Sequence, residues 1–476
     1  MIHDSLAGRE KSMENQTNAL NFFLNPQSVA VIGASAAAGK VGYAIIKNLL
    51  DSGFPGRIYP INPQIDEILG MKAYRSICDV PQRVDLAAIG IQPTLVPTVI
   101  QECATAGVKA ALIMTAGFAD AGDAGKRLQQ EVVETARQGK VRLMGPNTQG
   151  VFNLKANSVT LSVPFPQSFV QDGPIAFVCQ SALFPWHFVL KARHLGLSKM
   201  IDLGNMCDVS HAEALAYLGA DPETKVIVLH IEGTPDGRFL LQTAAQVARQ
   251  KPTIALKIGK TTAGGRAIAS HTGSMTGRDE AYDAAFRQTG ILRANDLDEL
   301  MDMIKTFLCL PPVHGRRVGI VTTSGAGGAI AADACEEFGL EVVEFSQQTI
   351  QKLRDALPDW ASINNPVDVW QVLDPLRLMS NFATALAALS SDPHVDAVAI
   401  VGHAPSVWPE FNITRILQEH AAKSIAKPVV IWTLGDEDGQ RQLLPLERKG
   451  LVTYPDIRRA IKALASSYFY HQMREK

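Results

Sequence analysis

Short runs of β-branched and other apolar residues alternate along the chain with segments whose apolar positions repeat at helical spacing. This alternation is typical of βα units, in which helices join the strands of a parallel sheet. Three of the apolar runs end in small residues directly before a helical segment, at 28–42, 174–186 and 317–334. These runs begin about 145 residues apart, which indicates three doubly wound α/β domains in series.

The stretches between the three runs have the composition of linkers. Residues 162–174 are rich in proline and polar residues. Residues 310–317 contain two prolines and follow an amphipathic helical pattern at 296–308. We therefore expect three domains, close to the usual size of ~150 residues each. Their expected bounds are 20–160, 161–310 and 311–476.

Composition and charge are those of an ordinary globular protein, with 46% hydrophobic residues and a formal net charge of -2. No basic excess indicates nucleic acid, and no apolar run approaches the ~20 residues of a membrane helix. The six cysteines lack CxxC spacing, which is typical of reduced thiols, and no ligand cluster predicts a bound metal. The polar start of the chain is neither a signal nor a transit peptide. We expect a cytoplasmic protein without nucleic-acid or membrane partners.

Each strand–helix junction is a candidate anion site, because backbone N–H groups and a helix dipole of about +0.5 charge meet there. A simple connecting turn is the alternative at any single junction. The first junction has Gly33, Gly39 and Gly42, which do not give GxGxxG spacing. The next strand ends in Asn62 and Pro63, where an NAD enzyme usually offers an acidic residue. These departures argue against a dinucleotide-dependent oxidoreductase.

The first 150 residues contain the succession GAS, GKVG, INP, AGF and GPNTQG. This succession resembles the CoA-binding domain of the succinyl-CoA synthetase superfamily. More narrowly, it is similar to the NDP-forming acyl-CoA synthetases, such as ADP-forming acetyl-CoA synthetase. The resemblance implies an N-terminal Rossmann-like CoA-binding domain followed by two flavodoxin-like CoA-ligase domains. It also implies that CoA is bound by Gly33, Ser35, Lys40, Asn62, Pro63, Pro93 and Asn147.

The motif SHTGS at 270–274 matches the family motif whose histidine is phosphorylated, so the resemblance assigns that role to His271. Imidazole suits this role because it is largely neutral near pH 7 and is a good nucleophile. Glycines around the motif predict a loop that is free to move. Glu232 closes an apolar strand, where a carboxylate is costly, and the resemblance implies that it orients the histidine ring. His230, on the same strand, is interpreted as a packing residue.

The resemblance further implies that two helix N-termini stabilise the phosphohistidine. The residues assigned to them are Gln180, Ser181 and Ala182 in the second domain, and Ser324, Gly325, Ala326 and Gly327 in the third. Ala182 replaces the glycine usual in the family, which keeps the N–H donors but narrows the approach of phosphate. Trp186 in the same segment is a candidate wall of an acyl pocket.

Three polar residues near these junctions have two interpretations each. Asp208 either borders the acyl or phosphate position or caps the helix that follows. Asp368 and His403 lie at strand ends of the third domain, as site residues or as structural ones.

The chain contains neither a P-loop nor room for an ATP-grasp domain. The resemblance therefore implies an alpha subunit that needs a separate ATP-grasp beta subunit, in an α2β2 assembly, with ADP or ATP and Mg²⁺ on the partner. The expected reaction interconverts acyl-CoA, ADP and phosphate with a carboxylic acid, CoA and ATP through acyl phosphate and phosphohistidine. A non-catalytic CoA- or nucleotide-binding regulator is the alternative, which the presence of both Glu232 and His271 disfavours. The acid, the direction and the choice of ADP or GDP stay open.

Overall fold

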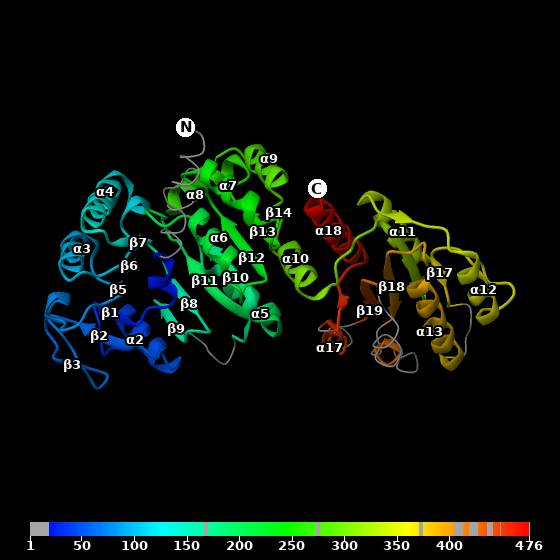
Figure 1. Ribbon diagram of the computed structural model, residues 1–476, viewed down its shortest axis with the longest axis horizontal. Coiled ribbons are helices and arrows are strands. Elements are labelled where there is room, and N and C mark those ends of the chain that lie inside the picture. Colours follow the sequence, from blue (N-terminus) through cyan, green and yellow to red (C-terminus); the bar gives the residue numbers. More distant parts are fainter. Residues whose placement is uncertain are drawn as a thin grey trace. The chain divides into compact units, whose positions relative to one another are not determined.

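The computed structural model of the chain describes most of its residues, with only the backbone described at 270–272 and 375–376. The described ranges are 19–165, 170–272, 277–370, 375–403, 413–417, 427–435, 441–447 and 449–475. The chain divides into two units, Met1–Asn295 and Asp296–Lys476. Unit 1 holds two large sheets and unit 2 holds one, each covered by helices (Figure 1). The predicted class of three consecutive doubly wound α/β sheets is confirmed, whereas the predicted domain bounds stay a prediction.

The first sheet has the strand order β2-β1-β5-β6-β7 and is parallel throughout. Its inner strands are buried on both faces, which is why they read as uninterrupted apolar runs. The strands are β1 Ser28–Ile32, β2 Arg57–Ile61, β5 Leu86–Ile89, β6 Ala110–Ile113 and β7 Arg142–Met144. The main helices are α2 Val41–Asp51, α3 Val96–Thr105 and α4 Gly122–Gly139, with short turns η1 Ile77–Asp79, η2 Pro93–Leu95 and η3 Ala119–Ala121. A small hairpin, β3 Glu67–Ile68 and β4 Met71–Lys72, stands apart.

The second sheet has the order β14-β13-β12-β10-β11-β8-β9. Its five parallel strands follow the flavodoxin order 2-1-3-4-5. They are β10 Asp172–Cys179, β11 Leu197–Asp202, β12 Val226–Ile231, β13 Thr253–Lys257 and β14 Leu292–Ala294. The helices are α5 Leu183–Ala192, η5 Arg193–Leu195, α6 His211–Ala220, α7 Gly237–Val247, α8 Thr262–Thr272 and α9 Asp279–Thr289. The antiparallel strands β8 Gly150–Asn153 and β9 Ser158–Leu161 extend this sheet, although β8 lies before the expected bound at 160 and β9 crosses it.

The two sheets of unit 1 are joined by backbone pairing. The segment 205–209, which follows β11, runs antiparallel beside β7 of the first sheet. The amide nitrogens of Asn205, Cys207 and Val209 donate to carbonyl oxygens of residues 146, 145 and 143 at 2.8, 3.0 and 3.2 Å. The Asn48 side chain on α2 also donates to the Leu161 carbonyl at the end of β9. These bonds connect the carboxyl end of β7 in the first sheet to the segment after β11 in the second sheet.

The third sheet has the order β16-β15-β18-β19-β20, again the flavodoxin order, with β17 paired to β15. Its strands are β15 Arg317–Thr322, β16 Glu341–Val342, β17 Val367–Asp368, β18 Ala397–His403, β19 Val429–Leu434 and β20 Leu451–Thr453. The helices are α10 Leu297–Cys309, α11 Gly325–Glu337, α12 Gln347–Ala356, α13 Pro375–Ser391, α14 Ile413–Ile416, α17 Leu444–Glu447 and α18 Ile457–Glu475. The amphipathic pattern at 296–308 forms α10, which packs on α18.

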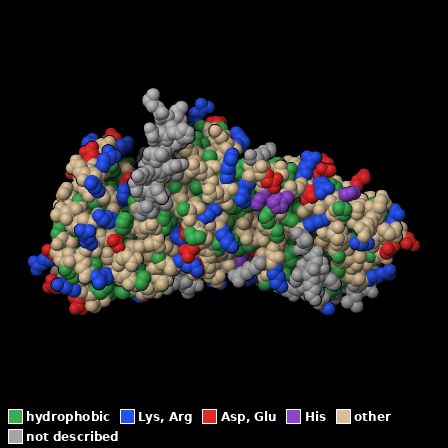
Figure 2. Space-filling model, viewed as in Figure 1, with side chains coloured by type: hydrophobic (Ala, Val, Ile, Leu, Met, Phe, Trp, Pro, Cys, Tyr) green, Lys and Arg blue, Asp and Glu red, His purple; other side chains and the backbone are tan. Residues whose placement is uncertain are grey.

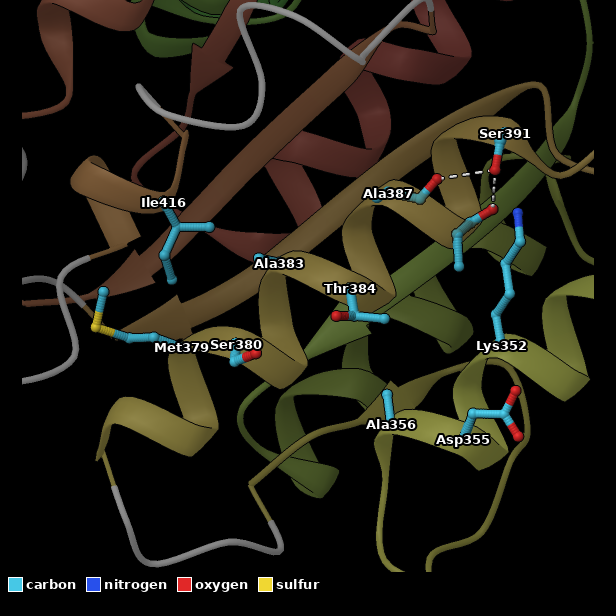
Figure 3. Close-up of a pocket in the computed structure, with 11 residues that line it drawn as sticks. Lys352, Asp355, Ala356, Met379, Ser380, Ala383, Thr384, Ala387, Ser391 and Ile416 are labelled. Carbon is cyan, nitrogen blue, oxygen red and sulfur yellow. Dashed lines mark hydrogen bonds between the residues drawn. The ribbon is translucent and has the colours of Figure 1, made fainter.

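Basic and acidic side chains are interspersed on the face shown in Figure 2. A cavity of about 740 Å³ lies between α12 and α13, and its lining includes Lys352, Met379 and Thr384 (Figure 3). None of the predicted site residues lines it. Within the described ranges, no helix is long and apolar enough to cross a bilayer, and no three potential metal ligands are grouped together.

Candidate functional site

The residues predicted to bind CoA follow the carboxyl ends of four strands of the first sheet. Gly33 and Ser35 follow β1, and Lys40 immediately precedes α2 with an exposed side chain. The remaining residues are Asn62 and Pro63 after β2, Pro93 at the start of η2, and Asn147 after β7. Ligands of open α/β sheets bind at this edge, so the positions fit the expectation. Their individual roles stay predictions.

The turn after β1 requires a glycine and an amide partner. Gly33 has a φ of +87°, and a Cβ there would lie 2.5 Å from the Gly90 carbonyl oxygen. The amides of Gly33 and Ala34 both donate to the Ile61 carbonyl at the end of β2, at 3.1 and 3.2 Å. The Asn62 side chain donates to the Ala34 carbonyl at 2.8 Å. A carboxylate cannot donate this bond, which explains an asparagine where an NAD enzyme carries an acid.

The loop after β7 connects the first sheet to the second. Asn147 has a φ of +59°, and its amide donates to the Thr115 carbonyl at 3.0 Å. The Thr148 hydroxyl donates to the backbone carbonyl of Asp202, and the Gln149 amide donates to the Asp202 carboxylate at 2.7 Å. Asp202 closes β11 and is 2% exposed. This buried carboxylate therefore holds the loop that carries a predicted CoA residue.

Gln180 and Glu232 meet at the carboxyl edge of the second sheet. Glu232 directly follows β12 and is 2% exposed, as the sequence predicts for the end of a buried strand. The Gln180 side-chain oxygen accepts the Glu232 amide at 2.8 Å and the Gly233 amide at 3.3 Å. The Gln180 side-chain nitrogen is buried and has no partner among the described residues. It is a donor available to an oxygen of a bound molecule.

Two charged residues at this edge were missed by the sequence analysis. Burial raises the pKa of Asp202 to about 6, and the charge of Glu232 adds to the rise against hydrogen bonds from Gln149 and Gly204. Burial lowers the pKa of Lys257, at the end of β13, to about 8. A charged residue that closes an apolar strand was the signal that identified Glu232. The same signal applied to every strand would have found both residues.

Two neutral histidines pack behind Gln180. His230 is 1% exposed, accepts the Gln180 amide at Nδ1 (3.4 Å) and stacks on Phe184 with ring centroids 3.8 Å apart. Burial places its pKa well below the usual range, and burial lowers the pKa of His211 to about 4. The His211 Nε2 atom donates to the His230 carbonyl at 3.0 Å. The interpretation of His230 as a packing residue agrees with this environment.

The N-terminus of α5 lies next to Gln180. Ala182 precedes the helix, is 2% exposed, and provides no side-chain cap. Trp186 in the first turn packs on Phe165, with ring centroids 6.1 Å apart. Phe184 is the aromatic residue of this helix that stacks on His230, the neighbour of Gln180.

The segment that carries His271 differs from the expected glycine-rich loop. Residues 262–272 form helix α8, in which Gly264 and Gly265 are helical. The Thr261 hydroxyl accepts the Gly264 amide at 3.1 Å, and three of the eleven helical residues are alanine, so two glycines do not prevent the helix. Helix α8 packs on η3, which follows the carboxyl end of β6. The side chain of His271 and the residue Gly273 lie outside the described residues.

Asp208 does not cap the following helix, so that interpretation was wrong. Ser210 caps α6 with a capping box that includes Glu213. Asp208 instead accepts two hydrogen bonds from Arg142, at 2.8 and 3.2 Å, and one from the Leu143 amide at 2.8 Å. The N-cap position of α6 is two residues further along, at Ser210, so the Asp208 carboxylate is placed to pair with Arg142 of β7 instead.

The third junction lies in unit 2 and has a regular cap. The Ser324 hydroxyl accepts the Gly327 amide at 3.2 Å at the start of α11, and Gly325 and Ala326 form the exposed first turn. The Asp368 carboxylate accepts the Trp370 amide at 3.0 Å. His403 Nδ1 is 2.8 Å from the Thr323 hydroxyl. Asp368 thus has a structural partner just after β17, and His403 has one where β15 and β18 end.

Three family models match consecutive parts of the chain. They are described as a CoA binding domain at 27–153, a succinyl-CoA ligase like flavodoxin domain at 172–307 and a Ligase-CoA domain at 318–473. The chain is 36% identical to the alpha subunit of acetate–CoA ligase [ADP-forming] I from Pyrococcus furiosus, over 96% of this chain and 99% of that one. The chain belongs to the ADP-forming acetyl-CoA synthetase family. It is an acid–thiol ligase of the ADP-forming acetate–CoA ligase type, as the resemblance implied.

The chain is also similar to a solved structure and to a further relative of the same family. An acetyl-CoA synthetase from Candidatus Korarchaeum cryptofilum, solved with phosphate and ADP, has a TM-score of 0.84 and 32% identity, covering 96% of this chain and 98% of that one. An acetate–CoA ligase [ADP-forming] from Methanocaldococcus jannaschii is 42% identical over 74% of this chain. The match spans 49% of that relative. The family therefore includes both separate alpha subunits and longer chains, and it uses CoA and a nucleotide.

Proposed function

We propose that the chain is the alpha subunit of an ADP-forming acyl-CoA synthetase. It interconverts acyl-CoA, ADP and phosphate with a carboxylic acid, CoA and ATP. CoA and the acyl group bind to this chain, and a separate ATP-grasp beta subunit in an α2β2 assembly holds the nucleotide with Mg²⁺. The Pyrococcus furiosus relative, itself named an alpha subunit and matched over 99% of its length, supports a separate partner.

The proposed reaction proceeds through two covalent intermediates. A phosphate oxygen attacks the thioester carbonyl, the C–S bond breaks, and CoA leaves as a thiol after it takes a proton. A ring nitrogen of His271 then attacks phosphorus, and the carboxylic acid leaves as a carboxylate. Finally, a terminal oxygen of ADP attacks the same phosphorus, the P–N bond breaks, and neutral His271 is restored with ATP. Each step exchanges one bond, which is the benefit of nucleophilic catalysis.

The observation that carries the proposal is the pairing of Gln180 and Glu232 in a unit where α8 packs beside the first sheet. Glu232 is buried and follows a rigid strand, so it can hold one ring nitrogen of His271 and present the other to phosphorus. The unpartnered nitrogen of Gln180 can donate to a phosphate or acyl oxygen. The N–H groups at Ser181 and Ala182 would add positive potential from α5.

The second predicted phosphate cradle consists of Ser324, Gly325, Ala326 and Gly327 at the start of α11. The Ser324 cap occupies the amide of Gly327, so the amides earlier in the turn are the ones that would meet phosphate. Phosphoryl transfer mostly needs positioning and charge stabilisation, and the positive potential at a helix N-terminus can stabilise the charge of a phosphate.

Labelling with [32P]phosphate tests the proposed function. The chain, co-purified with its ATP-grasp partner, is incubated with acetyl-CoA and labelled phosphate. We expect acid-labile, base-stable label on the chain in the wild type and in His314→Ala, whose histidine is exposed in unit 2. We expect none in His271→Ala. Equal labelling of His271→Ala, or no label in the wild type with any acyl-CoA tried, would contradict the proposal.

A further inference from the structure

Asn205, in the segment after β11, bonds to two loops of the first sheet. Its backbone amide donates to the Pro146 carbonyl at 2.8 Å, in the loop after β7. Its side-chain nitrogen donates to the Asp120 carboxylate of η3 at 2.8 Å and to the Gln129 side-chain oxygen of α4 at 3.2 Å. One residue of the second sheet therefore links the loops that follow β6 and β7.

Asp120 connects Asn205 to the rest of the loop after β6. Its carboxylate accepts the amides of Gly117 and Phe118 at 2.8 and 3.0 Å. Burial disfavours the charge of Asp120, but the bonds from Asn205 and from these two amides outweigh burial and lower its pKa. Gly117 has a φ of +101°, and a Cβ there would lie 3.2 Å from the ring of Pro93. The loop therefore rests against a residue that is predicted to bind CoA.

The loops at this edge of the first sheet are also bonded to one another. Gly204 has a φ of +54°, and a Cβ there would lie 2.3 Å from the Pro146 carbonyl oxygen, so the two segments are in close contact. The Asn147 amide donates to the Thr115 carbonyl at 3.0 Å, and the Thr115 hydroxyl donates to the Ile91 carbonyl at 2.7 Å. A shift of the loop after β7 is therefore expected to shift the loops after β6 and β5.

We propose that Asn205 is a positioning residue for CoA, whose side chain fixes the loops of the first sheet that bind CoA. The inference deepens the proposed function and rests on it, because that function places CoA at this edge. Affinity for CoA then depends on a residue outside the CoA binding domain at 27–153. If the loops adopt the binding shape only part of the time, the apparent affinity falls by that fraction.

One end of the Asn205 amide is not used in these contacts. Its side-chain oxygen is buried and has no partner among the described residues. Buried amides of purely structural residues are bonded at both ends in most proteins. This oxygen can accept a hydrogen bond from a bound molecule, and CoA carries both N–H and S–H groups. A direct contact with CoA is thus the alternative that the experiment must separate from positioning.

The test compares Asn205→Ala with Asn25→Ala in the full chain, co-purified with its partner. Asn25 is a matched control, because it is also half-buried and its side chain bonds to Tyr217 of α6 and Asn153 of β8 in the second sheet. It precedes β1, so it lies at the opposite edge of the first sheet. Calorimetric titration gives the dissociation constant of CoA, and thermal unfolding gives the midpoint. We expect the dissociation constant to rise about tenfold in Asn205→Ala and less than about twofold in Asn25→Ala.

A double-mutant cycle with Asp120→Asn tests how the effect reaches CoA. This variant keeps the shape of the side chain and one acceptor, but it places an amide nitrogen among the donors that surround Asp120. We expect the dissociation constant of CoA to rise about fivefold. Adding Asn205→Ala should raise it less than about twofold further, because both changes break the same bond. If Asn205→Ala does not fold, Asp120→Asn decides the test alone.

The outcomes separate this inference from the proposed function. Weak binding by folded Asn205→Ala, near-normal binding by Asn25→Ala and a non-additive cycle support the positioning role. Wild-type affinity in Asn205→Ala or Asp120→Asn would overturn it and leave the proposed function intact. Equal losses in Asn205→Ala and Asn25→Ala would also overturn it, and an additive cycle would assign the effect to direct contact. If the wild type binds no CoA, the proposed function fails first.

Discussion

The second and third sheets share one strand order but end in different chemistry. In the second sheet, the strands β10 to β13 lead into Gln180, Asp202, Glu232 and Lys257, which are buried and include three ionisable groups. In the third sheet, the corresponding edge carries hydroxyl groups, Asp368 and His403, which have local hydrogen-bond partners. Buried charges are costly, and a fold does not need them at a strand end. Under the proposed function, the second sheet carries the covalent chemistry, and the N-terminus of α11 in unit 2 is a candidate anion site.

Replacing Glu232 gives the largest expected difference between the two edges. Glu232→Gln keeps the shape and the backbone bond to Gln180 but removes the charge that would hold the His271 ring. We expect the rate of His271 labelling to fall at least about 100-fold, by analogy with other acids that orient a catalytic histidine. Asp368→Asn in the third sheet can still accept the Trp370 amide and should slow labelling less than about tenfold. The measurement is single-turnover labelling.

Glu213→Gln is a matched control, because it shows whether the loss of any buried carboxylate in unit 1 slows labelling. Glu213 is buried in the same unit, where it belongs to the capping box of α6 and pairs with Arg142. Glu213→Gln should lower stability and leave the labelling rate of the folded fraction close to that of the wild type. Comparable rates for Glu232→Gln and Asp368→Asn would remove the functional distinction between the sheets.

The pH dependence of stability tests whether the buried charge of Asp202, at the carboxyl edge of the second sheet, destabilises the fold. Because its pKa is raised to about 6, the folded chain keeps a proton that the unfolded chain releases from about pH 4 upward. The stability from this group is present below pH ~4 and is lost as the pH rises through 6. Asp202→Asn cannot ionise, so its unfolding free energy relative to the wild type should rise by up to about 3 kcal/mol between pH 4 and 7.5.

Asp396 in unit 2 provides the opposite case. Burial disfavours its charge, but bonds from Arg317 outweigh burial and lower its pKa. Its stabilising effect is therefore present at neutral pH and lost on acidification. The unfolding free energy of Asp396→Asn, relative to that of the wild type, should therefore fall as the pH rises. Pulse proteolysis in urea, read from fragments of each unit, measures both variants. If the relative unfolding free energies of Asp202→Asn and Asp396→Asn changed in the same direction with pH, the contrast between the two sites would be refuted.

The buried histidines predict acid sensitivity of unit 1. The pKa of His211 is lowered to about 4, so its stabilising effect is present above pH ~6.5 and is lost as the pH falls through 4. His211→Gln can still donate to the His230 carbonyl and should be more stable than the wild type by about 2 kcal/mol at pH 5, relative to pH 7.5. His314→Gln, at an exposed position, serves as the control in the same urea experiment. No relative gain for His211→Gln at pH 5 would contradict the prediction.

The fold was predictable because its strands are short, buried and almost wholly apolar. The three strand–helix junctions and the family motifs located the sheets, and Glu232 was found from its place at a strand end. Contacts between distant segments were not predictable from local pattern. Asp208 pairs with Arg142, and β8 and β9 join the second sheet, because each partner lies far away in the sequence or across a sheet boundary. Helix α8 was missed because glycine content suggested a loop while one threonine cap and several alanines sufficed for a helix.

Substitutions at the residues that precede α5 and α11 give the smallest expected difference in stability between the two units. Ser324 has extended backbone angles, φ -154° and ψ 115°, and caps α11, so Ser324→Ala should destabilise unit 2 by about 1 kcal/mol. Ala182 has helical angles, φ -70° and ψ -4°, which do not direct a side chain at the next amides. Ala182→Ser should therefore bring no gain in unit 1, because its hydroxyl would be buried without a cap to form. A gain of about 1 kcal/mol in urea unfolding of Ala182→Ser would mean that α5 accepts an ordinary cap. The amides at its N-terminus would then not be reserved for an anion.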